Sequence, residues 1–181
     1  DATLTSPYAF FQYWINVDDR DVGPYLRYFT FLTREEIEAL DKETADRPQA
    51  RTAARKLAEE LTTLVHGADE TARVIAASAA LFGQGELDAL DAATLTAALS
   101  EAPHVTLDGR LPTVTDLLVS TGLCASKSAA RRAVTEGGAY LNNVRIADAE
   151  AVPGDGDLLP GGWLVLRRGK RSLAGVRSTS R

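Results

Sequence analysis

The sequence contains no methionine and only one cysteine, Cys124, among its 181 residues. A single cysteine excludes an internal disulfide and any zinc site built from several thiolates, and it fits the reducing cytoplasm, where we expect the protein. No stretch approaches the ~20 consecutive apolar residues that a membrane-spanning helix needs. The sequence also does not open with the basic and then apolar residues of a secretory leader, so it does not indicate export. Because the chain opens on Asp1-Ala2-Thr3 without an initiator methionine, we expect it to be an internal piece of a longer protein.

Seven prolines and fourteen glycines are too few for a disordered or collagen-like chain, and 45% apolar with 25% charged residues is typical of a globular protein. The net charge of −5 conceals a division along the chain. Residues 1–111 carry 19 acidic and 10 basic side chains, a net charge of −9, whereas residues 112–181 carry 6 acidic and 10 basic, a net charge of +4. This division indicates two modules, of which the second suits a polyanion, although a solvated surface would explain four excess charges equally well.

Apolar periodicity predicts a bundle of helices over residues 1–100. A run of aromatic residues follows Pro7, a capping-box pattern joins Thr33 to Glu36, and Pro48 opens a longer helix that Gly67 ends. We expect helices over about 7–15, 22–29, 34–40, 48–66, 69–82 and 91–99. In the fifth of these the apolar stripe is expected at Ile75, Ala79 and Phe82.

The pattern changes in the second half. Residues 101–112 contain two prolines and a glycine where the charge changes sign, so we expect a linker there. Beyond it, two short helices are expected before and after Ser126, which can cap the second. Short strands flank Asn142-Asn143, whose tolerance of positive φ suits a tight hairpin, and two more follow near 163–166 and 174–177. The predicted fold is α+β, with an α-helical bundle followed over 113–181 by two helices and a short, mostly antiparallel sheet.

Residue patterns typical of catalysis are not found. His66 is at a helix end and His104 in the expected linker, and neither has a nucleophile or metal ligand at a useful spacing. Gly-Gln-Gly at 83–85 lacks the preceding strand and the third glycine of a dinucleotide-binding loop. The acidic run from Asp18 to Asp21 could suggest a metal, but carboxylates favoured by a helix dipole are the commoner reason for such a run. We therefore expect no catalytic, cofactor or metal site in this chain.

Two basic clusters lie in the second half, one on the helix that begins after Ser126 and one at the bend of the last hairpin. Like charges four residues apart, such as Lys127 and Arg131, destabilise a helix by roughly 0.2–0.5 kcal/mol, whereas a phosphate backbone along that face would favour them. RNA is favoured over DNA, because no helix carries the Asn, Arg and Gln set that reads a major groove. The candidate RNA-binding residues are Lys127, Arg131, Arg132, Arg167, Arg168, Lys170 and Arg171.

Residues 114–146, VTDLLVSTGLCASKSAARRAVTEGGAYLNNVRI, resemble the S-four-type RNA-binding domain, also called the αL domain. The resemblance lies in an apolar helix ended by Gly122, a Ser-Lys-x-x-Ala-Arg sequence on the next helix, a Gly-Gly pair, and a strand that ends in Asn. Residues 5–37 and 56–67 are similar to the segment that follows the catalytic domain of bacterial tyrosyl-tRNA synthetases, and LRRGKRS at 166–172 is similar to the arginine-rich end of the same family. The similar stretches cover essentially the whole chain.

The resemblance implies the tRNA-binding C-terminal region of a class I aminoacyl-tRNA synthetase, a tyrosine–tRNA ligase, without its catalytic domain. The HIGH-like and KMSKS-like signatures that handle ATP do not occur in the sequence. ATP, Mg²⁺ and tyrosine would therefore bind the parent's catalytic domain, through which the family forms homodimers, and this chain alone would not be an enzyme. The implied partner is tyrosine tRNA, with its anticodon arm near the helical domain and its variable arm on the αL domain. Asp18 and Asp19, at the bend between the first two helices, are the implied candidates for contacting anticodon bases.

Two other functions stay open on the sequence. The chain could be an independent RNA-binding or regulatory module that uses the αL domain without aminoacylation, or its helical half could be a protein-interaction bundle. The aromatic run at 8–15 distinguishes them in part, because a piece of a larger protein would expose some of this run, whereas an independent module should bury it.

Overall fold

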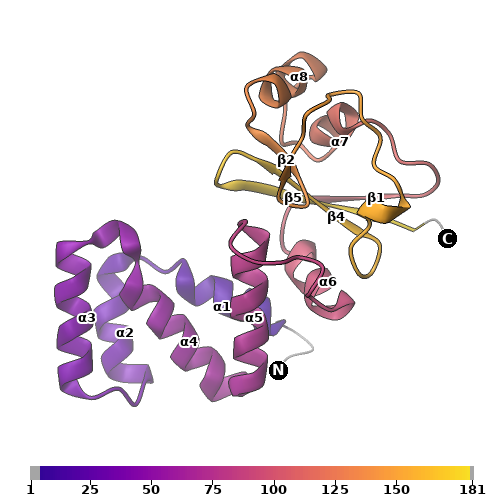
Figure 1. Cartoon of the computed structure of the whole chain (residues 1–181). Coiled ribbons are helices and arrows are strands. Elements are labelled where there is room, and N and C mark those ends of the chain that lie inside the picture. Colours follow the sequence, from indigo (N-terminus) through magenta and orange to yellow (C-terminus); the bar gives the residue numbers. More distant parts are fainter. Residues whose placement is uncertain (1–4, 180–181) are drawn as a thin grey trace. The chain divides into compact units, whose positions relative to one another are not determined.

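A computed structural model describes residues 5–179 (Figure 1). The chain divides into two compact units, residues 1–74 and 75–181, and the boundary falls inside helix α5 (Ala68–Leu81). Within the described part, no helix combines the length and the apolar character needed to cross a bilayer.

The first unit is a bundle of α-helices. They are α1 (Pro7–Ile15), α2 (Asp19–Phe29), α3 (Arg34–Asp46) and α4 (Thr52–His66), followed by the beginning of α5. α4 contacts each of the other three, and their shared core consists of Val22, Leu26, Ile37, Ala53, Ala54, Leu57 and Leu61. The predicted capping box is confirmed: the Thr33 hydroxyl accepts from the Glu36 backbone N–H, and the Glu36 carboxylate accepts from the backbone N–H of Thr33.

The start of α4 differs from the sequence prediction. Pro48 opens a short 3₁₀ turn (Pro48–Ala50) instead of the helix itself. Arg51 then has a left-handed backbone with φ of 51°, which separates this turn from α4. The helix therefore begins at Thr52, after the change in backbone direction.

The buried face of α5 also differs from the prediction. Ile75 and Phe82 are 38% and 42% exposed. The buried side chains of this helix lie about one position away, at Val74, Ala77, Ala80 and Leu81. The predicted stripe is wrong because α5 carries alanine on several sides, so the apolar pattern does not distinguish one face from the next.

The second unit is built on a five-stranded sheet with the strand order β1-β5-β4-β2-β3. The strands are β1 (His104–Leu107), β2 (Ala139–Leu141), β3 (Val144–Arg145), β4 (Trp163–Arg168) and β5 (Ser172–Ser178). β1 and β5 are parallel, and all other neighbours are antiparallel. Asn142 and Asn143 have φ values of 47° and 68° between β2 and β3, as the predicted tight hairpin requires.

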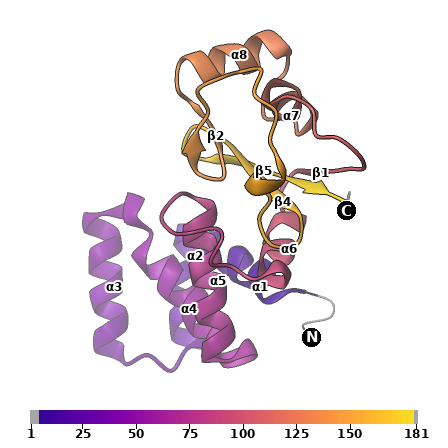
Figure 2. The same cartoon turned by 45° about the vertical axis from the view of Figure 1, so that its right-hand side comes forward.

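Helices cover both faces of this sheet. α7 (Val114–Ser120) and α8 (Lys127–Thr135) pack against the face that carries Leu164 and Leu166. α6 (Ala92–Ser100) lies on the opposite face (Figure 1 and Figure 2), where the Trp163 indole N–H donates to Thr96 Oγ1 at 3.0 Å. Successive residues of β4 therefore point to opposite helical layers, as the pleat of a strand requires.

β1 lies inside the segment 101–112 for which the sequence predicts a linker. His104 is in register with Gly175 and Leu107 with Ser178, so this strand forms an edge of the second unit's sheet. Two prolines and a glycine do exclude a helix here, but they do not exclude four residues between them from pairing as a strand. The pairing was not predicted because its partner, β5, is distant in sequence.

The α+β fold predicted from the sequence is confirmed. Helices α1 to α6 come first, and two further helices with a mixed, mostly antiparallel sheet follow.

Candidate nucleic-acid interface

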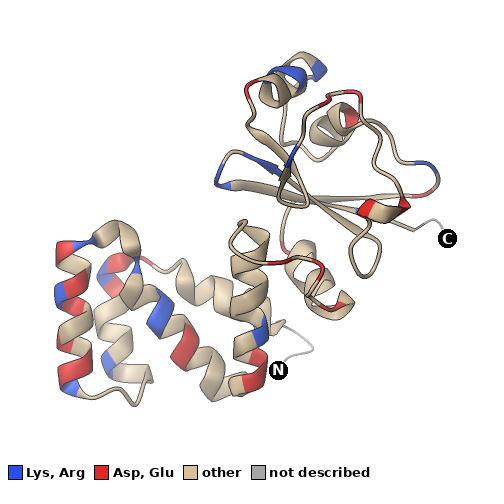
Figure 3. Ribbon diagram, viewed as in Figure 1, with Lys and Arg blue, Asp and Glu red and all other residues tan. Residues whose placement is uncertain are grey.

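The local sequence of α8 explains why this helix presents its basic residues to solvent. Ser126 caps it by accepting a hydrogen bond from the Ala129 backbone N–H at 3.2 Å. Ala130, Ala133 and Val134 are buried in the core of the second unit. The basic residues of α8 lie outside this apolar stripe and are exposed. They colour parts of the α8 ribbon blue in Figure 3.

Two of the three basic residues on α8 already have acidic partners. Lys127 Nζ lies 2.7 Å from Asp116 Oδ1, and Arg131 Nε lies 3.0 Å from Glu150 Oε1. The hydrogen bond from Lys127 lowers the pKa of the Asp116 carboxyl below its ordinary value. The local charge around each of these two cations is therefore largely balanced within the protein.

The second basic cluster is divided by the pleat of β4. Arg168 points toward the α7–α8 layer, where its Nη1 donates to the Leu123 carbonyl oxygen at 3.1 Å. Arg167 points to the opposite face and is only 9% exposed. Its guanidinium carbon lies 5.1 Å from the centre of the Tyr140 ring, and a Cβ at Gly83 would lie 2.8 Å from its terminal nitrogens. The structure thus separates Arg167 from the other predicted RNA-binding residues.

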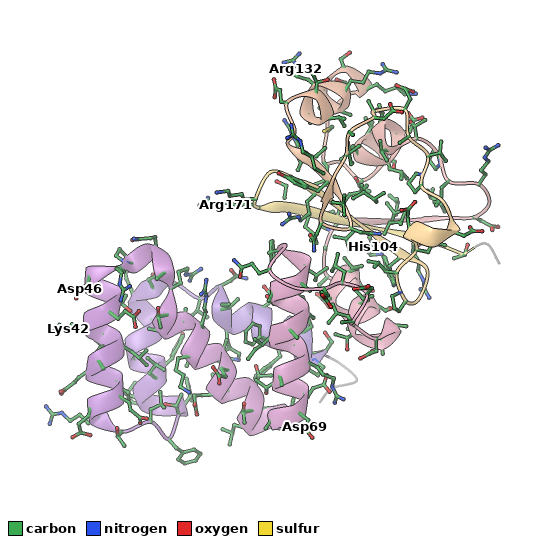
Figure 4. The ribbon with its side chains drawn as sticks, in the orientation of Figure 1. Lys42, Asp46, Asp69, His104, Arg132 and Arg171 are labelled. Atoms are coloured by element: carbon green, nitrogen blue, oxygen red, sulfur yellow. The ribbon has the colours of Figure 1, made fainter. Side chains whose placement is uncertain are left out.

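Besides the largely buried Arg167, four of the predicted cations have no carboxylate within ion-pair distance anywhere in residues 5–179. They lie on α8 and at the turn between β4 and β5, and Figure 4 labels one from each element. We call them the open basic cluster: Arg132, Arg168, Lys170 and Arg171.

A pocket of about 360 Å³ separates α8 from the β4–β5 turn. Arg132 and Arg168 of the open basic cluster both line it. The rest of its lining is small or polar: Ala129, Ala133, Glu136, Gly138, Gly169 and Ser172.

One basic residue near this site was missed by sequence reasoning. Arg145 on β3 is exposed, and its guanidinium lies over Gly137, where a Cβ would require the arginine to move. Gly137 follows the end of α8, so Arg145 adds a positive charge beside that helix. The only sequence signal was an isolated arginine after the Asn142-Asn143 turn.

The two aspartates considered for anticodon contacts belong to the first unit. Asp18 caps α2 and also accepts two hydrogen bonds from the Arg20 side chain, at 3.0 and 2.8 Å. That side-chain hydrogen bond holds the pKa of the Asp18 carboxyl well below its ordinary value. Arg51 Nη2 donates to Asp19 Oδ1 at 3.1 Å and to the Val17 carbonyl oxygen at 2.8 Å. The structure thus brings both aspartates together at the α1–α2 bend and fixes each with an arginine.

The aromatic run at 8–15 is partly buried and partly exposed. Tyr8 and Phe11 are buried, whereas Tyr13 is 66% exposed. Trp14 lies edge-on to Phe10 and Tyr25, with ring centres 6.1 and 5.7 Å apart. The run therefore contributes both to the bundle and to its surface.

Both histidines have aromatic neighbours. His66 lies edge-on to Phe10 with ring centres 5.2 Å apart, and His104 lies edge-on to Trp163 at 6.0 Å. Among the described residues, no three His, Cys, Asp or Glu side chains are grouped so that they could hold a metal ion.

Both halves of the chain are similar to known protein families. Residues 94–174 match the family described as Tyrosine–tRNA ligase SYY-like C-terminal domain, and residues 1–83 match the family described as tRNA synthetases class I (W and Y). The chain is 64% identical over 179 residues to a tyrosine–tRNA ligase of Streptomyces avermitilis and 62% identical over 179 residues to one of Streptomyces coelicolor. In both cases the match covers 99% of this chain and 42% of the relative, so the chain spans less than half the length of these proteins.

Among solved structures, a C-terminally truncated mitochondrial tyrosyl-tRNA synthetase of Aspergillus nidulans matches 41% of this chain and 22% of its own. The identity is 36% and the TM-score is 0.40.

Proposed function

Because the chain belongs to the tyrosine–tRNA ligase family and corresponds to the C-terminal part of its bacterial members, we propose that it is the tRNA-binding region of such an enzyme. In this function it holds tyrosine tRNA by the anticodon and variable arms, so that the acceptor end reaches a catalytic domain supplied by the rest of the protein. In this proposal ATP, Mg²⁺ and tyrosine bind that catalytic domain. The proposed location of the protein is the cytoplasm.

The observation that carries the proposal is the open basic cluster. Its four cations lack carboxylate partners among the described residues, so an RNA phosphate can bind them without displacing an acidic side chain. Phosphate contacts of this kind position an RNA but do not read its sequence. The proposed role is therefore to grip the variable arm and set the position of the tRNA.

Asp18 and Asp19 are proposed to act differently. A carboxylate repels phosphate and accepts hydrogen bonds only from donors such as base N–H groups. Arg20 and Arg51 hold these two carboxylates in place, and the side chains of Asp18 and Asp19 remain 47% and 58% exposed. We assign Arg51 as a positioning residue for Asp19.

The proposal is tested by measuring binding of the 181-residue chain to a tyrosine tRNA transcript and to the same tRNA with a shortened variable arm. We expect tighter binding of the full tRNA, and weaker binding when Arg132 and Arg168 are both replaced by alanine. Arg110→Ala is the matched control, because Arg110 is an exposed cation of the second unit outside the open basic cluster. The control double variant is Arg110→Ala with Arg177→Ala. If it loses as much affinity for tyrosine tRNA as the Arg132→Ala and Arg168→Ala double variant, the proposal is contradicted.

The same measurements address the second candidate, an independent RNA-binding module. Such a module would bind both tRNAs equally and with the same dependence on Arg132 and Arg168. A preference for the long variable arm favours the synthetase function.

Anticodon contacts need a separate test, because Asp18 also caps α2. Asp18→Asn keeps a good N-cap and removes the charge, so a change in stability should be small. We expect Asp18→Asn and Asp19→Asn to reduce discrimination between tyrosine tRNA and a transcript with a substituted anticodon. If both variants discriminate as well as the unmodified chain, the aspartates have no part in recognition.

A further inference from the structure

We propose that the pocket between α8 and the β4–β5 turn holds one unpaired nucleotide of the bound RNA, with its phosphate at Arg132 and Arg168 and its base over Ala129 and Ala133. The inference rests on the proposed RNA-binding function and extends it from backbone contacts to the recognition of a single base.

The size and shape of the pocket suit a nucleotide. Its volume of about 360 Å³ lies within the range of roughly 300–1,000 Å³ that small-molecule sites occupy. Ala129, Ala133 and Gly138 contribute only methyl groups and backbone to its lining, so no bulky side chain fills the space. A flat base can lie against such a surface without a large side chain having to move.

Two arginines of the pocket, Arg132 and Arg168, are the groups that would bind the phosphate of the nucleotide. Arg132 comes from α8 and Arg168 from the end of β4, so two arginines from different elements line the pocket. Neither has a carboxylate partner within the described residues, and an arginine plane can also stack on an exposed base.

The negative charge of Glu136 favours a nucleotide in the pocket over a continuous row of backbone phosphates. Glu136 lines the same pocket, one helical turn after Arg132, and its carboxylate pairs with no cation among residues 5–179. A row of phosphates passing through the pocket would be repelled there. A base carrying an amino group can instead donate a hydrogen bond to this carboxylate. Guanine, adenine and cytosine carry such a group. Uracil has only its N3–H on that edge, between two carbonyl oxygens that repel a carboxylate, so we expect uracil to be bound least well.

The test uses the full chain and RNA hairpins of identical stem sequence, either fully paired or with one bulged nucleotide, prepared with each of the four bases. Fluorescence anisotropy at one salt concentration gives the dissociation constants. We expect the hairpins with bulged guanine, adenine or cytosine to bind about fivefold more tightly than the paired hairpin, which corresponds to about 1 kcal/mol. Bulged uracil should show a smaller advantage.

Two variants separate the parts of the proposal. Ala129→Leu fills the pocket without changing charge and should abolish the difference in affinity between the bulged and the paired hairpins. Thr135→Leu is its control, because it places a leucine at an exposed position of α8 that does not line the pocket. Glu136→Gln should keep the advantage of the bulge but remove the preference against uracil, since an amide both donates and accepts.

The outcomes are distinct from those that test the proposed function. If the chain binds tyrosine tRNA but does not distinguish bulged from paired hairpins, or if Ala129→Leu retains the full distinction, the nucleotide pocket is rejected and the tRNA-binding function is not. If the chain binds neither tyrosine tRNA nor any hairpin, the proposed function itself is rejected. Because Glu136 is exposed, Glu136→Gln tests base preference even if Ala129→Leu does not fold.

Discussion

Replacing all four residues of the open basic cluster with alanine should flatten the salt dependence of RNA binding by a predictable amount. Each phosphate neutralised by a protein cation contributes about −0.9 to the slope of log K against log salt for a duplex. Four contacts therefore contribute about −3.6, which is a loss of about 150-fold in affinity between 50 and 200 mM salt. The quadruple variant should lose this part of the slope and keep whatever the first unit contributes.

The structure makes a different prediction for the two cations of α8 that have acidic partners. Lys127 and Arg131 are balanced by Asp116 and Glu150, so binding RNA there releases few additional ions. The double variant Lys127→Ala with Arg131→Ala should thus change the slope by clearly less than the value of about 1.8 expected for two free cations. Glu150→Gln leaves Arg131 unpaired and should steepen the slope by up to about 0.9.

The assay is a titration of tyrosine tRNA with each variant at four or more salt concentrations. If the double variant loses as much slope per residue as the quadruple variant, then the acidic partners do not matter. The division of these six cations into a paired and an open group is then refuted. Circular dichroism of each variant checks that a lost slope does not come from unfolding.

Three further predictions follow from individual contacts. Hydrogen exchange should be slower at the β1 amides that bond to β5 than at residues 108–110, and equal rates would rule out the strand. The lowered pKa of Asp116 stabilises the fold fully above its ordinary value near 4, and this stabilisation is lost as the pH falls through the lower folded-state value. Urea unfolding should therefore show Asp116→Asn less stable than the unmodified protein at pH 7, with a gap that narrows below pH 4. Finally, Arg51→Ala should be less stable than Arg51→Gly by about 1 kcal/mol, because glycine adopts the left-handed backbone without strain; the opposite order in urea unfolding would contradict that reason.

Local signals in the sequence were sufficient for most of the helices. Ser126, Thr33 and Asp91 were expected to begin helices, and each accepts the capping hydrogen bond from the backbone N–H three residues later. The same applies to the Asn142-Asn143 turn, whose geometry depends on two adjacent residues. Such features are predictable because the interacting groups are neighbours in the chain.

The site was predicted less completely. Which face of the sheet an arginine lies on, and which carboxylate it pairs with, depend on residues that are distant in the sequence. Arg167 and Arg168 are adjacent in a basic run, and the run alone does not indicate that one of them faces a buried layer. The pleat of β4 separates them only because α6 and the end of α5 cover one face and α7 and α8 the other. Likewise, Arg131 pairs with Glu150, nineteen positions along the chain, and no periodicity within α8 could indicate this partner.

The position of β5 has a consequence for the order in which the second unit can be assembled during synthesis. β5 is the last strand in the chain, yet it lies between β1 and β4 in the sheet. On the ribosome, β1 emerges early and has no partner until β5 has also left the exit tunnel, so its unpaired edge stays open while α7, α8 and the β2–β3 hairpin are being made. A stop codon before residue 172 would leave β1 permanently without a partner and would remove the inner strand against which Trp163 and its neighbours pack.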